Sequence, residues 1–200
     1  AYKERFDRNN FFQNLLLDNL LLVDIYNRAK KLHVEVTAPR VVFLVETKME
    51  KDSIVTELLK EMFSAHGGDY ITAVDERSVI LIKSLEENYT QETLNQIANT
   101  IADMTNAEAM LNVKVAYGTV VSELKDVSKS YKEAKMALDV GKIFYAEKNV
   151  IAYSTLGIGR LIYQLPVNLC RIFIQEIFGD NVPEELDDEM LGTINKFFEN

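Results

Sequence analysis

Residues Leu111–Tyr153 decide the fold: LNVKVAYGTVV, then SELKDVSKSYKEAKMALDVGKIFYAEK, then NVIAY. The first part alternates apolar side chains with others up to Gly118, which is typical of a half-buried strand. The middle part places apolar side chains at helical spacing with lysines opposite, and Ser122 or Asp126 can cap its start. The last part is a short apolar run. The stretch therefore predicts a strand, a helix and a strand that returns to the same sheet.

Five further elements are predicted ahead of this stretch, in the order strand, helix, strand, strand, helix. Residues 40–47 (RVVFLVET) are almost continuously apolar, as in a central strand covered on both faces. The segments YITAV and VILIKSL flank a polar turn at 75–78 and predict a β-hairpin. The two helices are expected from Asp52 or Ser53 to about Ala65, and from Gln91 to Met104 after an N-cap at Thr90. The expected fold is an α/β (α+β) sheet in the order β-α-β-β-α-β-α-β, flanked by helices.

An N-terminal helix is predicted over Phe11–Val34, which has apolar residues at helical spacing. Its apolar stripe widens at residues 20–23 beyond what one core face needs, so two sides of this helix must be covered. Burial within the chain and contact with a second copy both stay open as explanations. The candidates for a contact in a homodimer are Leu15, Leu16, Leu20 and Val23.

The chain beyond Tyr153 changes character and becomes rich in predicted helix. Residues 156–178 carry apolar side chains at helical spacing, and Pro166 is expected to divide them into two helices. An acidic stretch at 183–188 then precedes an amphipathic one that runs to Asn200, where the chain looks cut from a longer one. The predicted units are an N-terminal helical segment (1–36), a sheet domain (37–156) and a C-terminal helical segment (157–200).

Composition predicts a soluble, cytoplasmic protein. Hydrophobic residues make up 48% of the chain, and no apolar run approaches the roughly 20 residues needed to cross a bilayer. No signal peptide is recognisable, and the single cysteine, Cys170, fits a reducing compartment and an inert core thiol. A net charge of −9 disfavours binding to nucleic acid, because such binding needs clustered lysine and arginine. If the intact protein binds DNA, another part of it makes the contact.

The order of residues in Leu111–Tyr153 resembles the last third of a GGDEF domain. In such a domain a strand ending in glycine precedes a helix with alanines near its end and a strand ending in an aromatic residue. The matching residues here are Gly118, Ala134, Ala137, Gly141, Asn149 and Tyr153.

The chain is still more similar to the degenerate GGDEF-like domain of the PucR/CdaR family of bacterial transcriptional regulators. This resemblance lies in Tyr131-Lys132-Glu133-Ala134, in Ala137-Leu138 and in Leu156-Gly157. Residues 26–33 resemble the segment that precedes this domain in the family. Residues 187–200 are similar to the helix just before the family's C-terminal helix-turn-helix.

An active GGDEF cyclase holds divalent metal and GTP with carboxylates at the end of its first strand and in its hairpin turn. In this sequence those places offer Glu46, Asp75 and Glu76 as metal candidates, without the paired turn glycines that let a backbone approach the nucleotide. Gly67-Gly68-Asp69-Tyr70 matches the motif by its letters but lies before the hairpin, so a helix end and a turn are expected there. The expectation is therefore no enzyme activity, no resident metal and no cofactor.

The resemblance implies the regulatory and dimerisation region of a transcriptional regulator that activates catabolic genes, for example those of sugar diacid utilisation. DNA would be read by a C-terminal domain outside these 200 residues, and no membrane partner is expected. The alternative is a non-catalytic domain that senses a nucleotide or another metabolite, in which case a small-molecule effector binds this region directly. An enzyme of unrecognised type is the third reading, and no converging polar constellation in the sequence favours it.

Overall fold

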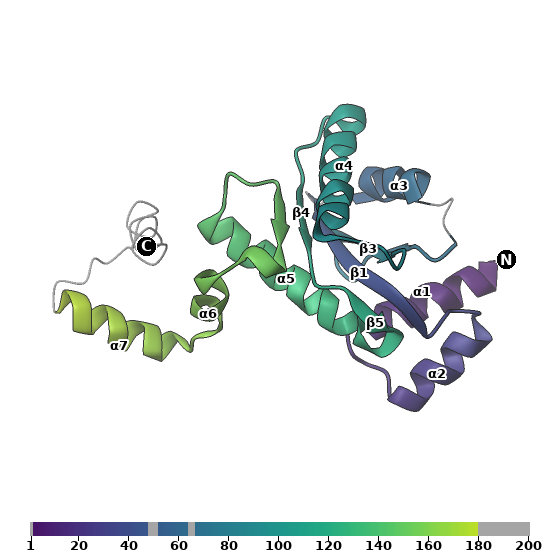
Figure 1. Ribbon diagram of the computed structural model, residues 1–200, viewed down its shortest axis with the longest axis horizontal. Coiled ribbons are helices and arrows are strands. Elements are labelled where there is room, and N and C mark those ends of the chain that lie inside the picture. The colour runs from purple at the N-terminus through teal and green to yellow at the C-terminus, as the bar shows by residue number, and fades with distance from the viewer. Residues whose placement is uncertain (1, 48–51, 64–66, 180–200) are drawn as a thin grey trace.

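The computed structural model describes residues 2–47, 52–63 and 67–179, which form a mixed α+β fold (Figure 1). The predicted order β-α-β-β-α-β-α-β is confirmed, with one short strand, β5, added to it. The elements are α1 (Tyr2–Leu16), α2 (Leu22–Lys31), β1 (Thr37–Glu46), α3 (Asp52–Phe63), β2 (Tyr70–Thr72), β3 (Ser78–Ser84), α4 (Gln91–Ala109), β4 (Lys114–Tyr117), β5 (Val121–Glu123), α5 (Val127–Phe144), β6 (Val150–Ala152), α6 (Ile158–Gln164) and α7 (Val167–Phe178).

A six-stranded sheet carries the fold, with β2, β3, β1, β4 and β6 side by side in that order. The central strand β1 runs antiparallel to its neighbours β3 and β4, and β5 pairs with the first part of β1. Because β2 is antiparallel to β3, it is parallel to β1, from which β3 separates it. In the same way β1 separates the parallel strands β3 and β4. These two interlocked split β-α-β units make the ferredoxin-like part of the fold, and β6 adds to β4 in parallel.

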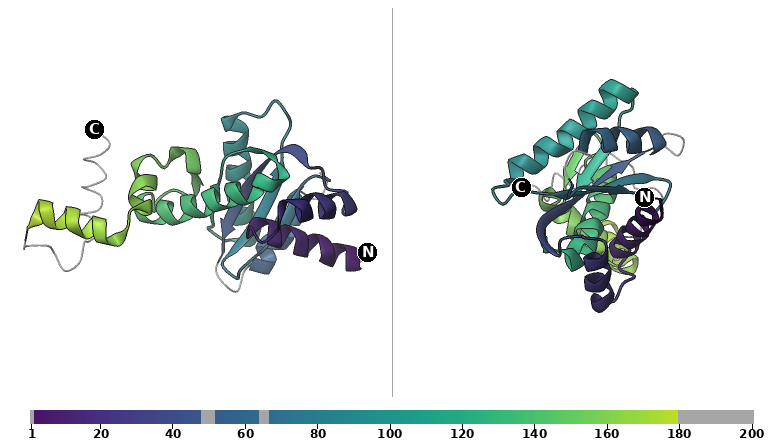
Figure 2. Two further views of the ribbon diagram at one scale, coloured as in Figure 1. Left: turned by 90° about the horizontal axis from the view of Figure 1, so that it is seen from below. Right: turned by 90° about the vertical axis from the view of Figure 1, so that its right-hand side faces the viewer.

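Helices cover both faces of the sheet, and each face has its own core. Along β1, Val42 and Leu44 pack toward α1, α2 and α5, whereas Val41, Phe43 and Val45 pack toward α3 and α4. The right-hand view of Figure 2 shows α3 and α4 on one side of the sheet and α1 and α2 on the other. Burial on both faces explains why the sequence of β1 is an almost unbroken apolar run.

The first two helices are part of the sheet domain. Phe11 of α1 and Ala29 of α2 are fully buried in the core that α5 shares. A side-chain bond ties α1 to the hairpin, because Gln13 Nε2 donates to Ala73 O at 2.6 Å. Both helices, which fall in the segment predicted as an N-terminal unit (residues 1–36), therefore pack on the sheet together with α5, and the boundary at residue 36 stays a prediction.

The single helix predicted over Phe11–Val34 is wrong, because a tight turn ends α1 and separates it from α2. Asp18 has a left-handed backbone, with φ of 59°. Its N–H donates to Leu15 O at 3.2 Å, and the N–H of Asn19 donates to Asn14 O at 2.9 Å. This pair of bonds is the Schellman helix end, and aspartate is one of the few residues that tolerate its left-handed position.

The start of α5 also differs from the prediction. Ser122, one of the two predicted N-caps, lies in β5, and a 3-10 turn over Leu124–Asp126 leads into the helix. Asp126 holds the N-cap position without a side-chain hydrogen bond to the helix. The cap predicted for α4 is confirmed, because Thr93 N donates to Thr90 Oγ1 at 3.2 Å.

Two helices follow the sheet, and Pro166 separates α6 from α7 as predicted. In Figures 1 and 2, α7 lies at one end of the molecule and α1 at the other. The predicted acidic stretch and the final amphipathic stretch fall in residues 180–200, outside the described residues. No helix in the described part of the chain is long and apolar enough to cross a membrane.

Candidate functional site

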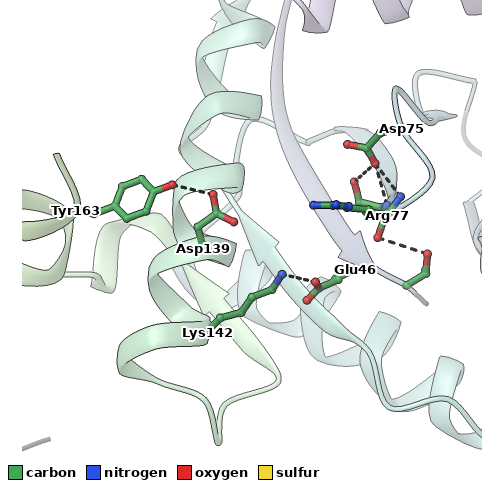
Figure 3. Close-up of polar contacts among 8 residues, drawn as sticks. Glu46, Asp75, Arg77, Asp139, Lys142 and Tyr163 are labelled. Carbon is green, nitrogen blue, oxygen red and sulfur yellow. Dashed lines mark hydrogen bonds and ion pairs between the residues drawn. The ribbon is translucent and has the colours of Figure 1, made fainter. Parts of the chain in front are cut away.

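The candidate site lies where β1 ends beside the turn of the β2–β3 hairpin (Figure 3). Glu46, the last residue of β1, is paired in the sheet with Ser78, the first residue of β3. The fold therefore brings the end of the first strand and the hairpin turn to one edge of the sheet. This is the arrangement for which the sequence suggested Glu46, Asp75 and Glu76 as metal candidates.

Asp75 fixes the geometry of its own turn. Its Oδ1 accepts from the backbone N–H of Arg77 at 2.9 Å and from that of Ser78 at 3.2 Å. Arg77 O accepts in turn from Thr47 N at 2.8 Å, which joins the turn to the end of β1. An aspartate that binds backbone N–H groups just beyond it stabilises a turn without any glycine. Glu76 is exposed beside it.

Glu46 forms an ion pair with Lys142 of α5, as Figure 3 shows. The ammonium group lies against the carboxylate that a divalent cation at this edge would have to use, so a metal ion must displace it. Both side chains are partly exposed, and such a pair adds only about 0–1 kcal/mol to stability. Lys142 was not among the predicted site residues, because nothing in the local sequence relates it to the first strand.

No metal centre is assembled in the described ranges. Among residues 2–47, 52–63 and 67–179, no three His, Cys, Asp or Glu side chains lie together as a metal site requires. The segment Gly67-Gly68-Asp69-Tyr70 makes packing contacts instead. Gly67 and Gly68 lie in a turn, as predicted. A Cβ on Gly68 would lie 2.9 Å from Cβ of Ser84, and Asp69 accepts from Ser84 N at 2.9 Å. These contacts hold the turn against the end of β3.

A second polar contact of α5 holds α6, the helix that follows the last strand of the sheet. Tyr163 Oη of α6 donates to Asp139 Oδ2 at 3.0 Å, and this hydrogen bond raises the pKa of Tyr163. Gly159 lets α6 lie close to α5, because a Cβ there would be 3.0 Å from Cγ1 of Val140. Figure 3 shows Asp139 and Lys142 on the same helix. α5 therefore contacts the strand edge through Lys142 and α6 through Asp139.

Tyr131 of α5 is buried in the core on this side of the sheet. Burial, with a smaller contribution from the negative charge of Asp75, raises the pKa of Tyr131 to about 12. An unfolded chain has a tyrosine pKa of about 10. Between these two values the unfolded state loses the proton and the folded state keeps it, so stability falls as the pH rises.

We predict that Tyr131 does not make the free energy of unfolding depend on pH below pH 10. Between pH 10 and 12, ionisation of Tyr131 in the unfolded state should lower the free energy of unfolding by on the order of 2 kcal/mol. Urea unfolding followed by circular dichroism at several pH values measures this loss. The matched variant is Tyr131→Phe, which removes the ionisable hydroxyl and keeps the ring. A decline of equal size in both proteins would show that Tyr131 does not cause it.

The predicted dimer contacts fall into two groups. Leu15 and Leu16 are 2% and 0% exposed, so burial within the chain accounts for them and leaves no side-chain surface for a second copy. Leu20 is partly buried against the same core, whereas Val23 is 59% exposed. A contact between chains therefore stays a prediction for Val23 and its neighbours.

A further exposed apolar surface lies on the two helices after the sheet. We call it the α7 patch, and its side chains are between 46% and 68% exposed. Periodicity predicted these helices, but it could not show which of their faces would be covered. The α7 patch consists of Leu161, Leu165, Val167, Leu169, Ile172, Phe173 and Ile177.

The interlocked sheet with helices on both faces is consistent with a GGDEF-like fold. The family model described as the GGDEF-like domain matches residues 19–140, and the chain belongs to this family. A similar solved structure is described as the crystal structure of a regulator of polyketide synthase expression from Bifidobacterium adolescentis. The two share a TM-score of 0.52 and 10% sequence identity, over 98% of this chain and 78% of that one, which is a likeness of fold. No curated protein matches the chain.

Proposed function

We propose that this chain is the regulatory and dimerising part of a bacterial transcriptional regulator of the PucR/CdaR kind and that it acts without catalysis. The observation that carries the proposal is that both acidic side chains at this edge of the sheet already have partners. Glu46 is paired with Lys142, and Asp75 is engaged by the backbone of its own turn. Both carboxylates on which a cyclase of this fold depends therefore have other partners.

Membership of the GGDEF-like family and the solved neighbour, a regulator of expression, support this proposal. The domain would couple an upstream sensor to downstream helices through α5, which packs on β1 and contacts α6 at Asp139. DNA would be contacted by residues outside these 200, in keeping with the net charge of −9. The regulated genes would be catabolic, with sugar diacid utilisation as the first candidate.

A sensing function is the second candidate, and a shallow, open surface hollow is the place to test for a ligand. The hollow lies between α3 and α4 and has a volume of about 380 Å³. Its lining combines Met62, Phe63 and Ile97 with the polar Thr93, Gln96 and Thr100, so it offers apolar contact with some hydrogen bonding. A ligand there would raise the melting temperature of the protein, because it stabilises the folded state by mass action. Thermal shifts with GTP, cyclic dinucleotides and sugar diacids would reveal such a ligand.

The test of the regulatory function is made in cells. Deletion of the gene should change the transcript levels of a set of catabolic genes, and the full-length gene should restore them. The full-length gene with Glu46→Gln should restore them equally well, because the proposal gives this carboxylate no chemistry. Unchanged transcripts after deletion would contradict the regulatory role. Failed restoration by a stable Glu46→Gln protein would show that the strand edge takes part in the function.

A further inference from the structure

We infer that the α7 patch is the surface through which a second copy of this chain binds. The inference deepens the proposed function, because it assigns the dimer contact to particular helices. It moves that contact away from the residues that the sequence suggested, two of which are buried in the core.

The distribution of polar and apolar residues around α7 is typical of a helix that is buried on most of its circumference. Its polar residues Asn168, Arg171 and Gln175 are spaced three and four residues apart and form one stripe. Apolar residues and Cys170 occupy nearly all the other positions, and Glu176 is the only acidic residue in the helix. A helix with such a wide apolar arc is stable when that arc is buried. Yet the apolar side chains Leu169 and Phe173 are about half exposed.

The position of α7 leaves this arc open to another molecule. α6 is held on α5 by the Tyr163–Asp139 hydrogen bond and by close packing at Gly159. α7 departs after Pro166 and packs extensively against no other helix or strand of the described residues. Figure 1 and the left-hand view of Figure 2 show it projecting from the end of the molecule. A second copy can therefore approach α7 without meeting the sheet of the first chain.

The size of the patch matches one half of a dimer interface. Its seven side chains together expose on the order of 600 Å² of apolar surface, the upper end of the largest patch on a typical monomer, about 300–600 Å². Two such patches face to face would bury on the order of 1,200 Å², where specific interfaces begin. A face with almost no charge needs no complementary charge pattern, so it suits contact with its own copy across a two-fold axis.

The first test is the mass of the 200-residue chain in solution by sedimentation equilibrium. The wild-type chain should be a dimer in the micromolar range. Leu169→Lys and Phe173→Lys should each raise the dissociation constant at least about 30-fold, since each places an ammonium group at the centre of the interface. Asn168→Lys, the same change on the polar stripe of the same helix, should leave the dissociation constant unchanged. Val23→Lys should also leave it unchanged.

Three results would overturn the inference. The first is a wild-type chain that stays monomeric at about 100 µM. The second is a dimer that Leu169→Lys and Phe173→Lys leave intact. The third is a dimer that dissociates only with Val23→Lys, which would move the interface to the corner between α1 and α2. Transcript levels are measured separately, so failure of this inference is distinguishable from failure of the regulatory role.

Alkylation of the single cysteine, Cys170, is a second measurement and shows what covers the α7 patch. Cys170 lies on the apolar arc of α7 and is partly exposed in the single chain. With a second copy on the patch, alkylation of Cys170 by iodoacetamide should slow as protein concentration rises, and Phe173→Lys should abolish that dependence. Slow alkylation at every concentration would mean that another segment of the same chain covers α7, which contradicts the inference. Fast alkylation at every concentration would mean that nothing covers it.

Discussion

Gly118→Ala should lower the free energy of unfolding by about 3 kcal/mol or more, because the methyl group has no room. A Cβ on Gly118 would lie 2.2 Å from the backbone oxygen of Ser130 and 2.7 Å from its Oγ. That hydroxyl accepts from Val42 N at 3.0 Å and donates to Thr119 O at 2.8 Å. Displacing α5 to make room would break both bonds and leave a buried backbone N–H without a partner. Urea unfolding measures the loss.

Gly141→Ala, within α5, is the matched control. A Cβ there would meet Cδ1 of Ile151 at 2.1 Å, which is the far end of a flexible side chain rather than backbone. Rotation of Ile151 can relieve the contact, and alanine gains about 1 kcal/mol over glycine inside a helix. The net change should therefore stay within about 1 kcal/mol. Equal losses in the two variants would contradict the close approach of α5 to the end of β4.

Phe11→Ala should cost about 3–5 kcal/mol of unfolding free energy, as expected for a large side chain removed from a packed core. Phe11 is fully buried against the sheet, whereas Phe6, in the same helix, is 62% exposed. Phe6→Ala should change stability by no more than about 0.5 kcal/mol. Thermal unfolding of both variants in one buffer compares them directly. A small loss at Phe11 would show that α1 is not part of the domain core.

The regular part of the fold could be predicted from the sequence because it follows from local patterns. The apolar run of β1 reports burial on both faces, and the alternation up to Gly118 reports a strand. The polar turn at 75–78 separates two apolar runs, so the hairpin was predictable as well. These signals need only neighbouring residues, and tertiary packing did not override them.

The departures from prediction come from backbone conformation and from contacts distant in sequence. Asp18 breaks the first helix by taking a left-handed conformation, which is rare for a residue other than glycine. β5 is only three residues long and is fixed by pairing with β1. The Glu46–Lys142 pair joins the first strand to the last long helix of the sheet domain. No local pattern encodes such a contact, so the strand edge could be located from sequence but the partner of Glu46 could not.

The exposure of the α7 patch could not be predicted for a related reason. Apolar spacing in Val167–Phe178 predicts that a face of this helix is covered, and it does not say by what. The same ambiguity applied to Leu15 and Leu16, which the structure resolves as core. Only the arrangement of the helices around the sheet separates the two cases.

The most direct test of the central claim is a titration of the 200-residue chain with GTP in the presence of Mn²⁺, followed by calorimetry and by chromatography of the products. If Glu46 is held by Lys142 and Asp75 by its turn, no heat of binding and no cyclic dinucleotide should be detected. Saturable GTP binding or conversion of GTP by the wild-type chain would contradict the account.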